Sequence, residues 1–543
     1  TRLHCFFPSP PHLKGVWKGS FLRLASWANI VVMLPVRRAL TSCFDGMLDM
    51  LQDVSSSITW AEKMNGAMVP VTPAEHVKMT VKSGKAPEDL SGVYLRVGPN
   101  AQFWPPKKRT HAFDGDGMVH SVRISKGEAS YHCRFMETPR YVFEKERGSE
   151  WFIRVGEMSG LAGLLKIMTT GKKKQKLSGL IEHETSTANT AIGYTPDGKL
   201  WALNEGGAPF RFNLDKDGVP GSMGYDDLQN TLKESISAHP KFDQRNGEIL
   251  FHGRKLPEKF YAGKIVDGKL VERVDIDMPV AGFHHDMFIT ENYMVLIDGA
   301  MSFSPKEAIQ GKQLWTFDQA KKLRFGIFPR SQKLTRENLQ WIEADVAAEI
   351  VHTCYAYDQD GKIILWTPVS YYSADSTGTI LGGLGSGHMK RVVIDLNAKD
   401  VKIQDVEGAQ KFATEFPRIR DDRVGLRVRY GFSGLQSPEG DFDFRGIMKW
   451  DFNLCKLDKV IHFPEGVVGG EPVFIPKTGK VEDDDGYICL LLWNQKTQES
   501  TFAVYNAKTF DSTPVVEFLV HRRVPLGFHA AWITEEQFQQ QLK

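Results

Sequence analysis

The sequence has almost no excess of charge of either sign, and this balance excludes several classes of protein. Its 543 residues include 68 lysines and arginines and 66 aspartates and glutamates, which gives a formal net charge of +2. Such a chain has no global basic field for binding nucleic acid and no acidic excess of the kind that marks disordered tails. Its composition, 41% hydrophobic and 25% charged, predicts an ordinary globular protein with a sizeable core.

Cysteines at metal-binding or redox spacing are also absent. The six cysteines are isolated in the sequence: Cys5, Cys43, Cys133, Cys354, Cys455 and Cys489. Without any Cys-x-x-Cys pair, a zinc ribbon, a thioredoxin-like centre and a dense disulfide framework are excluded. Isolated cysteines fit a reducing compartment, where each acts as a small buried hydrophobic residue; oxidised pairing between them is the alternative.

Two common enzyme motifs are missing as well. Gly382, Gly383, Gly385 and Gly387 lack the third-glycine spacing of a dinucleotide-binding fingerprint. The segment Gly431-Phe-Ser433-Gly434 lacks the spacing of a nucleophile elbow. We therefore expect neither a nicotinamide cofactor nor a serine hydrolase.

Long hydrophobic runs are absent near the start of the chain, where the uncharged run 24–36 is too short to span a bilayer. Apolar residues instead recur at helical spacing on both sides of a proline: Trp17, Phe21, Leu24, Ala28 and Val31, then Leu40, Phe44, Met47 and Leu51. This pattern predicts two amphipathic helices in an N-terminal segment, residues 1–60. Their apolar faces fit a membrane interface, packing on the body of the protein, or a targeting remnant, and we favour these in that order.

Residues 61–543 carry the patterns of an all-β domain. Short β-branched and aromatic runs begin at Asp89, and several flank Asp-Gly turns of the hairpin type at Asp197, Asp267, Asp360 and Asp485. These turns are 70, 93 and 125 residues apart. The spacing is too irregular for a solenoid but compatible with propeller blades that carry insertions.

One predicted helical insertion interrupts the strands. Its apolar face and the basic run after it consist of Leu161, Leu164, Leu165 and Met168, then Lys172, Lys173, Lys174 and Lys176. Such a segment is typical of a membrane-surface contact, whereas a core-packed helix followed by a solvated lysine loop is the alternative. Together with the N-terminal helices it would form one apolar, membrane-facing patch, which favours a lipophilic substrate.

Four of the sixteen histidines lie in strand or strand-end contexts: His239, His285, His352 and His529. Their separations of 46, 67 and 177 residues exclude a local metal finger. A propeller, however, brings the inner strands of distant blades to one axis. Imidazole suits iron, zinc and copper, so the spacing alone names no metal, and each histidine taken singly also fits a structural role.

Three glutamates, Glu205, Glu415 and Glu471, occur in apolar or glycine-rich surroundings that normally exclude a charge. A carboxylate that accepts the second ring N–H of a metal-bound histidine has a reason to be buried, because it fixes the tautomer and offsets the metal's charge. Without such a role burial is costly. The alternative is a glutamate at a strand end that reaches solvent.

The histidine and glutamate contexts resemble those of the carotenoid cleavage oxygenase family, in the same order along the chain. The resemblance runs from about Leu90 to Ile533 and includes Leu95-Arg-Val-Gly-Pro-Asn100, Phe113-Asp-Gly-Asp-Gly-Met-Val-His120, Ala238-His-Pro-Lys241, His285-Asp286, Thr290-Glu-Asn292, Glu415-Phe-Pro-Arg418, Glu471-Pro472 and Gly527-Phe-His529. It implies a seven-bladed β-propeller with Fe(II) on its axis, held by four histidines and no directly bound carboxylate.

The resemblance also implies the role of each site residue. The iron ligands are His239, His285, His352 and His529, and three of them are supported by Glu205, Glu415 and Glu471 in a pairing that the sequence does not assign. Because neighbouring strand residues face opposite ways, only one of His284 and His285 faces the metal, and the His-Asp motif selects His285. Thr190, in Thr187-Ala-Asn-Thr190, is similar to a threonine that limits access to an open iron position in some members.

The implied reaction is oxidative cleavage of a conjugated double bond of a carotenoid or apocarotenoid by O2, with two carbonyl products. The segments 187–190, 312–318 and 322–330 are similar to the plant-type enzymes that cut the 9,10 (9′,10′) bonds. The alternatives within the fold are 11,12 cleavage of epoxycarotenoids, stilbene cleavage and retinoid isomerisation. A non-catalytic, membrane-attached propeller is the alternative from a different class, and plastid and cytoplasm are both open as compartments.

Two local departures from the family pattern bear on the substrate. Thr353-Cys354-Tyr355 follows the third histidine in place of the usual asparagine-alanine-aromatic run. His111-Ala112 stands just before Phe113, where an aromatic residue is usual. Neither change removes a ligand, but both are expected to reshape the substrate tunnel.

Overall fold

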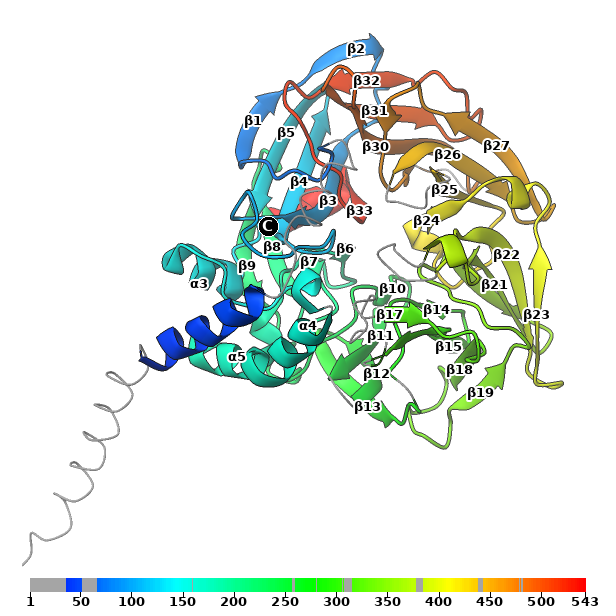
Figure 1. Cartoon of the computed structure of the whole chain (residues 1–543). Coiled ribbons are helices and arrows are strands. Elements are labelled where there is room, and N and C mark those ends of the chain that lie inside the picture. Colours follow the sequence, from blue (N-terminus) through cyan, green and yellow to red (C-terminus); the bar gives the residue numbers. More distant parts are fainter. Residues whose placement is uncertain are drawn as a thin grey trace, which may run out of the picture.

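Seven antiparallel β-sheets form a ring around a central axis in the computed structural model (Figure 1). The structure describes residues 36–50, 66–158, 160–255, 259–279, 281–304, 306, 315–376, 384–437, 443–477, 479 and 482–543. Each sheet has four or more strands, so the fold is a seven-bladed β-propeller. The all-β fold class predicted from the sequence is confirmed.

Five blades follow one another in sequence order. The first contains β6 (Ala191–Tyr194), β7 (Leu200–Leu203), β8 (Phe210–Leu214) and β9 (Pro220–Tyr225). The second contains β10 (Lys241–Asp243), β11 (Glu248–Lys255), β12 (Lys259–Val266) and β13 (Lys269–Ile276). The third contains β14 (Met287–Ile289), β15 (Tyr293–Asp298), β18 (Arg324–Pro329) and β19 (Gln340–Glu343), with the ribbon β16 (Met301–Phe303) and β17 (Trp315–Phe317) inserted.

The next two blades have the same simple order. The fourth contains β20 (Tyr355–Gln359), β21 (Lys362–Val369), β22 (His388–Asp395) and β23 (Asp400–Asp405). The fifth contains β24 (Thr414–Arg418), β25 (Tyr430–Gln436), β26 (Phe444–Asp451) and β27 (Lys456–His462).

The last two blades combine strands from both ends of the described chain. The sixth contains β28 (Val467–Val468), β29 (Val473–Pro476), β30 (Gly486–Asn494), β31 (Ser500–Asn506), β32 (Val516–Leu519) and β2 (Thr80–Gly84). The seventh contains β33 (Ala530–Thr534), β3 (Gly92–Asn100), β4 (Asp116–Ser125), β5 (Glu128–Phe135) and β1 (Ala74–Lys78). The ring is therefore closed by β33, which pairs with β3.

The hydrophobic core lies in layers between neighbouring blades. One cluster joins the sixth and seventh blades and includes Tyr94 of β3 and Phe502 of β31, whose rings lie 5.1 Å apart. Another joins the third and fourth blades through Val295 of β15 and Leu365 of β21. Because each blade is covered on both faces, its central strands are nearly continuous apolar runs.

The predicted Asp-Gly turns all connect adjacent strands. Asp197 and Asp360 lie between the first two strands of their sheets, Asp267 lies between β12 and β13, and Asp485 lies between β29 and β30. Asp267 and Asp360 adopt φ values of 50° and 51°, the left-handed conformation that such hairpins require. The spacing is irregular because Asp267 occupies a different connection within its blade, and because these turns belong to the first, second, fourth and sixth blades and skip the third and fifth.

Apart from α7 (Glu535–Gln541), which contacts β3 and β33, the α-helices lie together on one side of the propeller, near β9 (Figure 1). The described helices include residues 36–49, α3 (Pro139–Arg147), α4 (Gly160–Lys166), α5 (Lys172–Ser178) and α7 (Glu535–Gln541). The turn η2 (Ile167–Gly171) joins α4 to α5, and the other short turns are η1 (Val155–Met158), η3 (Glu182–Thr185), η4 (Ala374–Ser376), η5 (Ala409–Lys411) and η6 (Asp421–Arg423). None of the described helices is long and apolar enough to cross a membrane.

Helix 36–49 and the insertion leave many of their large apolar side chains in solvent, although Leu48 is buried and Leu164 is half-buried. The exposed residues, which we call the apolar patch, are Val36, Leu40, Phe44, Met47, Met50, Leu161, Leu165 and Met168. The exposed fraction is 66% for Leu40 and 80% for Met168. The helical spacing from Leu40 to Met47 is thus present, whereas residues 17–31 and Leu51 lie outside the described part of the chain.

A buried ionic cluster holds helix 36–49 against the insertion. Asp45 accepts from Lys174 and from Lys108, whose Nζ lies 2.8 Å from its carboxylate. Glu157 of η1 lies 2.9 Å from Lys166 Nζ, and Lys166 also pairs with Asp49. This corrects the sequence interpretation of Lys174 as part of an exposed basic run, because Lys174 is 2% exposed while Lys172, Lys173 and Lys176 are exposed.

The five described cysteines are free, and two of them, Cys133 and Cys489, are buried. This matches the expectation of isolated thiols, except that Cys43 of helix 36–49 is exposed.

Ring closure generates a stability prediction. Ile533 of β33 is fully buried and lies opposite Val93 of β3. Ile533→Ala should lower the free energy of unfolding by about 2–5 kcal/mol, because it leaves a cavity in the strand pair that closes the ring. Urea unfolding measures the change. Lys508→Ala, at an exposed position, is the control and should stay within about 0.5 kcal/mol of the parent; equal unfolding curves for the two variants would contradict the prediction.

Candidate metal centre

Each of the seven blades places one predicted site residue at or near the start of an inner strand. In blade order these residues are Thr190 before β6, His239 before β10, His285 before β14, His352 before β20, Glu415 in β24, Glu471 before β29 and His529 before β33. Inner strands of a propeller converge on the axis, so residues more than 300 positions apart meet there. Glu205, which follows β7, is the eighth member of the predicted set.

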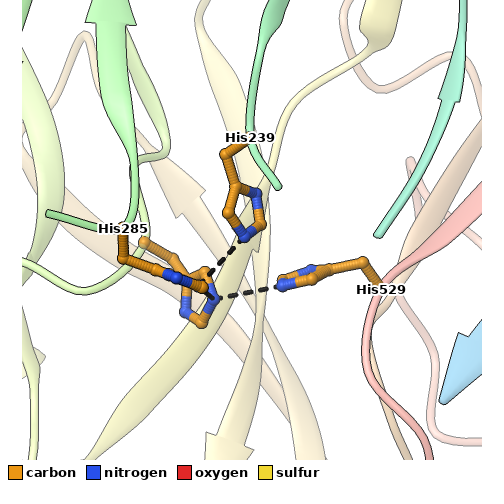
Figure 2. Close-up of side chains that lie close together, drawn as sticks. His239, His285 and His529 are labelled. Carbon is orange, nitrogen blue, oxygen red and sulfur yellow. Dashed lines mark hydrogen bonds between the residues drawn. The ribbon is translucent and has the colours of Figure 1, made fainter. Parts of the chain in front are cut away.

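The four histidines point their Nε2 atoms at one another. The Nε2 atom of His285 lies 3.0 Å from that of His239 and 3.1 Å from that of His352, and the Nε2 atom of His529 also lies 3.1 Å from that of His352. Figure 2 shows the rings of His239, His285 and His529 converging from different segments. One ligand atom from each of the four histidines lies within 4.8 Å of the others.

Three of the four histidines have a glutamate at their second ring nitrogen. Nδ1 of His285 lies 2.9 Å from Glu205, Nδ1 of His352 lies 2.7 Å from Glu415, and Nδ1 of His529 lies 3.0 Å from Glu471. The structure thereby assigns each of the three glutamates to one histidine, an assignment that the sequence left open. Among the described residues, no carboxylate pairs with His239.

These pairs determine which histidine nitrogen is free to bind a metal. A carboxylate at Nδ1 selects the tautomer that carries its proton there, which leaves the Nε2 lone pair free. Three Nε2 lone pairs then face one another across about 3 Å, an arrangement that is repulsive unless a cation lies between them. The donor set therefore fits a bound metal ion.

The nitrogen separations also fit a particular coordination angle. Zinc–imidazole bonds are about 2.1 Å long, so two such ligands lie about 3.0 Å apart at a right angle and about 3.4 Å apart at the tetrahedral angle. The observed separations of 3.0 to 3.1 Å match the right angle. Four imidazole nitrogens gathered in this way would hold iron, zinc, copper or nickel, so the donor set fits a metal ion without naming which one.

The glutamates supply negative charge around this centre. Burial alone raises the pKa of Glu471, but the Arg418 guanidinium and His529 lower it to about 2. His285 likewise outweighs burial and lowers the pKa of Glu205. Burial and the three neighbouring histidines hold the pKa of His239 well below its usual range. Burial likewise lowers the pKa of His529, whereas the Glu415 carboxylate outweighs burial and raises the pKa of His352. The centre therefore favours neutral imidazole at His239 and His529, the form that binds a metal cation.

A ring of contacts just beyond the histidines ties their loops together, and sequence reasoning missed it. Lys241 Nζ lies 2.6 Å from the Asp286 carboxylate and donates to Thr353 Oγ1 at 3.0 Å. The backbone N–H and the hydroxyl of Thr353 both donate to Asp286 at 2.8 Å. These residues follow His239, His285 and His352 by one or two positions. This closeness in sequence to the histidines is the signal from which the contacts could have been predicted.

Two further residues flank the centre as the sequence suggested. His284 points away from the cluster, with Nε2 3.2 Å from Asp298 Oδ1. The Thr190 hydroxyl donates to Asn189 Oδ1 at 3.0 Å, and its carbonyl accepts from the His529 N–H at 3.3 Å. Thr190 is thus attached to a histidine segment, while its role in limiting access stays a prediction.

Two cavities adjoin the centre. The first, of about 440 Å³, is lined by residues that include His239, His352 and His529. The second, of about 470 Å³, is lined by Thr190 and Glu205 and by the rings of Phe113, Phe283, Trp315 and Phe528. His111, one of the two local departures from the family pattern, also lines the second cavity. Apolar walls with a few polar groups are typical of sites for small organic ligands.

Fold and site together define a class, the seven-bladed propeller with four axial histidines of metal-binding geometry. The model of the RPE65 family, described as retinal pigment epithelial membrane protein, matches residues 68–534. The chain therefore belongs to the RPE65 and carotenoid cleavage oxygenase family, and the resemblance inferred from the motifs is confirmed.

Named relatives and solved structures agree with this family. A carotenoid 9,10(9′,10′)-cleavage dioxygenase of Phaseolus vulgaris is 31% identical over 503 residues, which covers 88% of this chain and 91% of the relative. A chloroplastic 9-cis-epoxycarotenoid dioxygenase of Arabidopsis thaliana is 28% identical, covering 89% and 83%. A lignostilbene dioxygenase of Pseudomonas brassicacearum shares the fold with a TM-score of 0.73 at 22% identity, over 86% of this chain and 96% of that chain.

The glutamate pairs generate a prediction about metal retention. Glu415→Gln keeps the side-chain shape but removes the charge at His352 Nδ1, so metal affinity should fall about 10- to 100-fold. Metal content after dialysis against graded chelator measures this change. Glu407→Gln, at an exposed position, is the matched control and should retain metal like the parent. Unchanged retention in Glu415→Gln would mean that the pair does not tune the centre.

Proposed function

We propose that the protein is a non-heme Fe(II) dioxygenase that cleaves a conjugated double bond of a carotenoid or apocarotenoid into two carbonyl products. The observation that carries this proposal is the cluster of four Nε2 atoms, three of them from histidines paired with a glutamate. Bound Fe(II) would supply the activation of O2, whose two atoms end on the two carbons of the cleaved bond.

The chain's own residues hold, orient and shield the reactants. His239, His285, His352 and His529 would bind the metal as neutral imidazoles, and Glu205, Glu415 and Glu471 would fix the tautomer of three of them. The aromatic walls of the 470 Å³ cavity provide an apolar surface for a polyene and exclude water. Thr190, on the wall of the same cavity, would restrict the space beside the metal.

The preferred bond is the 9,10 (9′,10′) bond. The support is the 31% identity to relatives named for that cleavage, against 28% for the epoxycarotenoid relative. Cleavage of an epoxycarotenoid at the 11,12 bond is the second candidate, because that relative also matches most of the chain.

Relatives named chloroplastic favour a plastid location over the cytoplasm.

We further propose that residues 1–60 and the insertion attach the catalytic propeller, residues 61–543, to a membrane surface. The apolar patch on helix 36–49, α4 and η2 supports this proposal, because large apolar side chains gathered in solvent mark an interaction site. Lys172, Lys173 and Lys176 are exposed beside it, and basic residues at such a position are attracted to anionic lipid.

Incubation of the Fe(II)-loaded protein under O2 with detergent-dispersed carotenoids, apocarotenoids and stilbenes tests the reaction. We expect carbonyl products from cleavage at the 9,10 bond, identified by mass spectrometry, with label from ¹⁸O2 in both products. His352→Ala should bind less iron and form no product. Cleavage at another bond would correct the regiochemistry. Full iron occupancy without cleavage would favour isomerisation, and failure to bind iron would favour a non-catalytic propeller.

Sedimentation with anionic phospholipid vesicles tests the membrane proposal. The double change Leu40→Asp and Met168→Asp should weaken vesicle binding at least tenfold, because each side chain loses its apolar contact with lipid. Val271→Asp, at an apolar position on β13 that is also exposed, is the control and should bind like the parent. Undiminished binding of the double variant would exclude the apolar patch as the contact.

A further inference from the structure

Among the described residues, the ring of His239 pairs with no carboxylate, in contrast to the other three histidines of the centre. Its Nε2 atom nevertheless lies 3.0 Å from that of His285. Because a carboxylate partner normally orients a metal-bound histidine, His239 needs its support from the segment that carries it. On one side of the ring, this support is a hydrogen bond of 3.3 Å from the Ala238 N–H to Glu205.

The other side of the ring is held by a bridge of three side chains, Lys241, Asp286 and Thr353, which we call the axial bridge. Lys241 Nζ lies 2.6 Å from Asp286 Oδ1 and donates to Thr353 Oγ1 at 3.0 Å. The Thr353 hydroxyl donates in turn to Asp286 Oδ2 at 2.8 Å, so the three groups form a closed cycle. Because they lie at the starts of the second, third and fourth blades, the cycle joins these blades beside the histidines.

Asp286 has a fixed orientation within the axial bridge. It is 3% exposed, and its two oxygens accept from four donors. These donors are Lys241 Nζ, the N–H and the hydroxyl of Thr353, and the Met287 N–H at 2.7 Å. A carboxylate has about four acceptor positions, so all of them are used here and the group has no second arrangement of equal quality.

The axial bridge differs from the three glutamates in its charge. The glutamates bring negative charge to the histidines, whereas Lys241 and Asp286 form a pair of opposite charges. By charge alone, Lys241 opposes the binding of a cation, since it lines the same cavity as His239 and His352. A favourable contribution of Lys241 to metal binding therefore comes from geometry, through the position that it gives to the segment of His239.

We propose that Lys241 is a positioning residue that holds His239 in the metal centre through the axial bridge, in place of the carboxylate that this histidine lacks. The inference rests on the proposed metal-dependent function and adds a residue that supports the fourth ligand. It also gives a role to Thr353, one of the local departures from the family pattern, because its hydroxyl completes the cycle.

Metal retention by the loaded protein tests the proposal. The protein is loaded with Co(II) and dialysed against graded chelator, and the visible absorption of the bound Co(II) reports its ligands. Lys241→Met should lower the metal affinity about 10- to 100-fold, the usual effect of removing a group that orients a ligand. The spectrum of the remaining Co(II) should change, because it depends on the number and geometry of the ligands. Charge alone predicts tighter binding, since the substitution removes a cation beside the centre.

Three further variants separate positioning from charge and from stability. The double change Lys241→Met and Asp286→Asn restores the charge balance without the axial bridge, so its metal affinity should stay low. Thr353→Ser keeps the hydroxyl and should retain metal like the parent. Lys449→Met is the matched control, because Lys449 is buried in β26 with its Nζ 2.7 Å from Asp484, and it should also retain metal like the parent.

Each other outcome overturns the proposal. Unchanged or tighter metal binding by Lys241→Met would mean that Lys241 gives no positional support. Recovery in the double variant would assign the loss to the unpaired charge of Asp286, and an equal loss in Lys449→Met would assign it to general stability. If the parent retains no metal, the proposed dioxygenase function fails together with this inference. If the parent retains metal and Lys241→Met does so equally, only the inference fails.

Discussion

The pairing of β33 with β3 is the constraint on which the centre depends. It joins strands from opposite ends of the described chain and closes the ring of blades. His529 directly precedes β33, and its backbone N–H donates to the Thr190 carbonyl. Closure therefore brings the last histidine to the other three and joins it to the segment that starts the first blade. A propeller axis exists only in the closed ring, so this one strand pair positions a site that no single blade contains.

Charge balance is the second requirement of the centre. The chain meets it with carboxylates next to the histidines and with basic side chains next to some of those carboxylates. Neutral imidazoles bring no charge, whereas the glutamates behind them bring carboxylate charge to the centre, from the buried Glu471 and the half-buried Glu205 and Glu415. Arg418 lies 3.0 Å from Glu471, and Lys241 lies 2.6 Å from Asp286, so part of this charge is paired within the chain. Because unpaired buried carboxylates are costly, the remaining negative charge favours occupation of the histidine cluster by a cation.

The sequence predicted the fold class and the residues of the centre, because the motifs around the histidines and glutamates carry that information locally. It did not assign Glu205 to His285, because this pairing depends on which loops are neighbours at the axis. It also misjudged Lys174, whose partner Asp45 lies 129 residues away on another helix.

The turn η1 (Val155–Met158) connects the apolar patch with the second cavity. Glu157 of η1 belongs to the ionic cluster that holds helix 36–49, while Val155 and Met158 of the same turn line the cavity. The cluster pairs the charged face of helix 36–49 with Lys108, Lys166 and Lys174, and this orientation leaves the apolar face outward. The exposed apolar patch is thus anchored on the wall of the second cavity. If the apolar patch contacts lipid as proposed, η1 is the element that joins the lipid-binding surface to the cavity beside the metal centre.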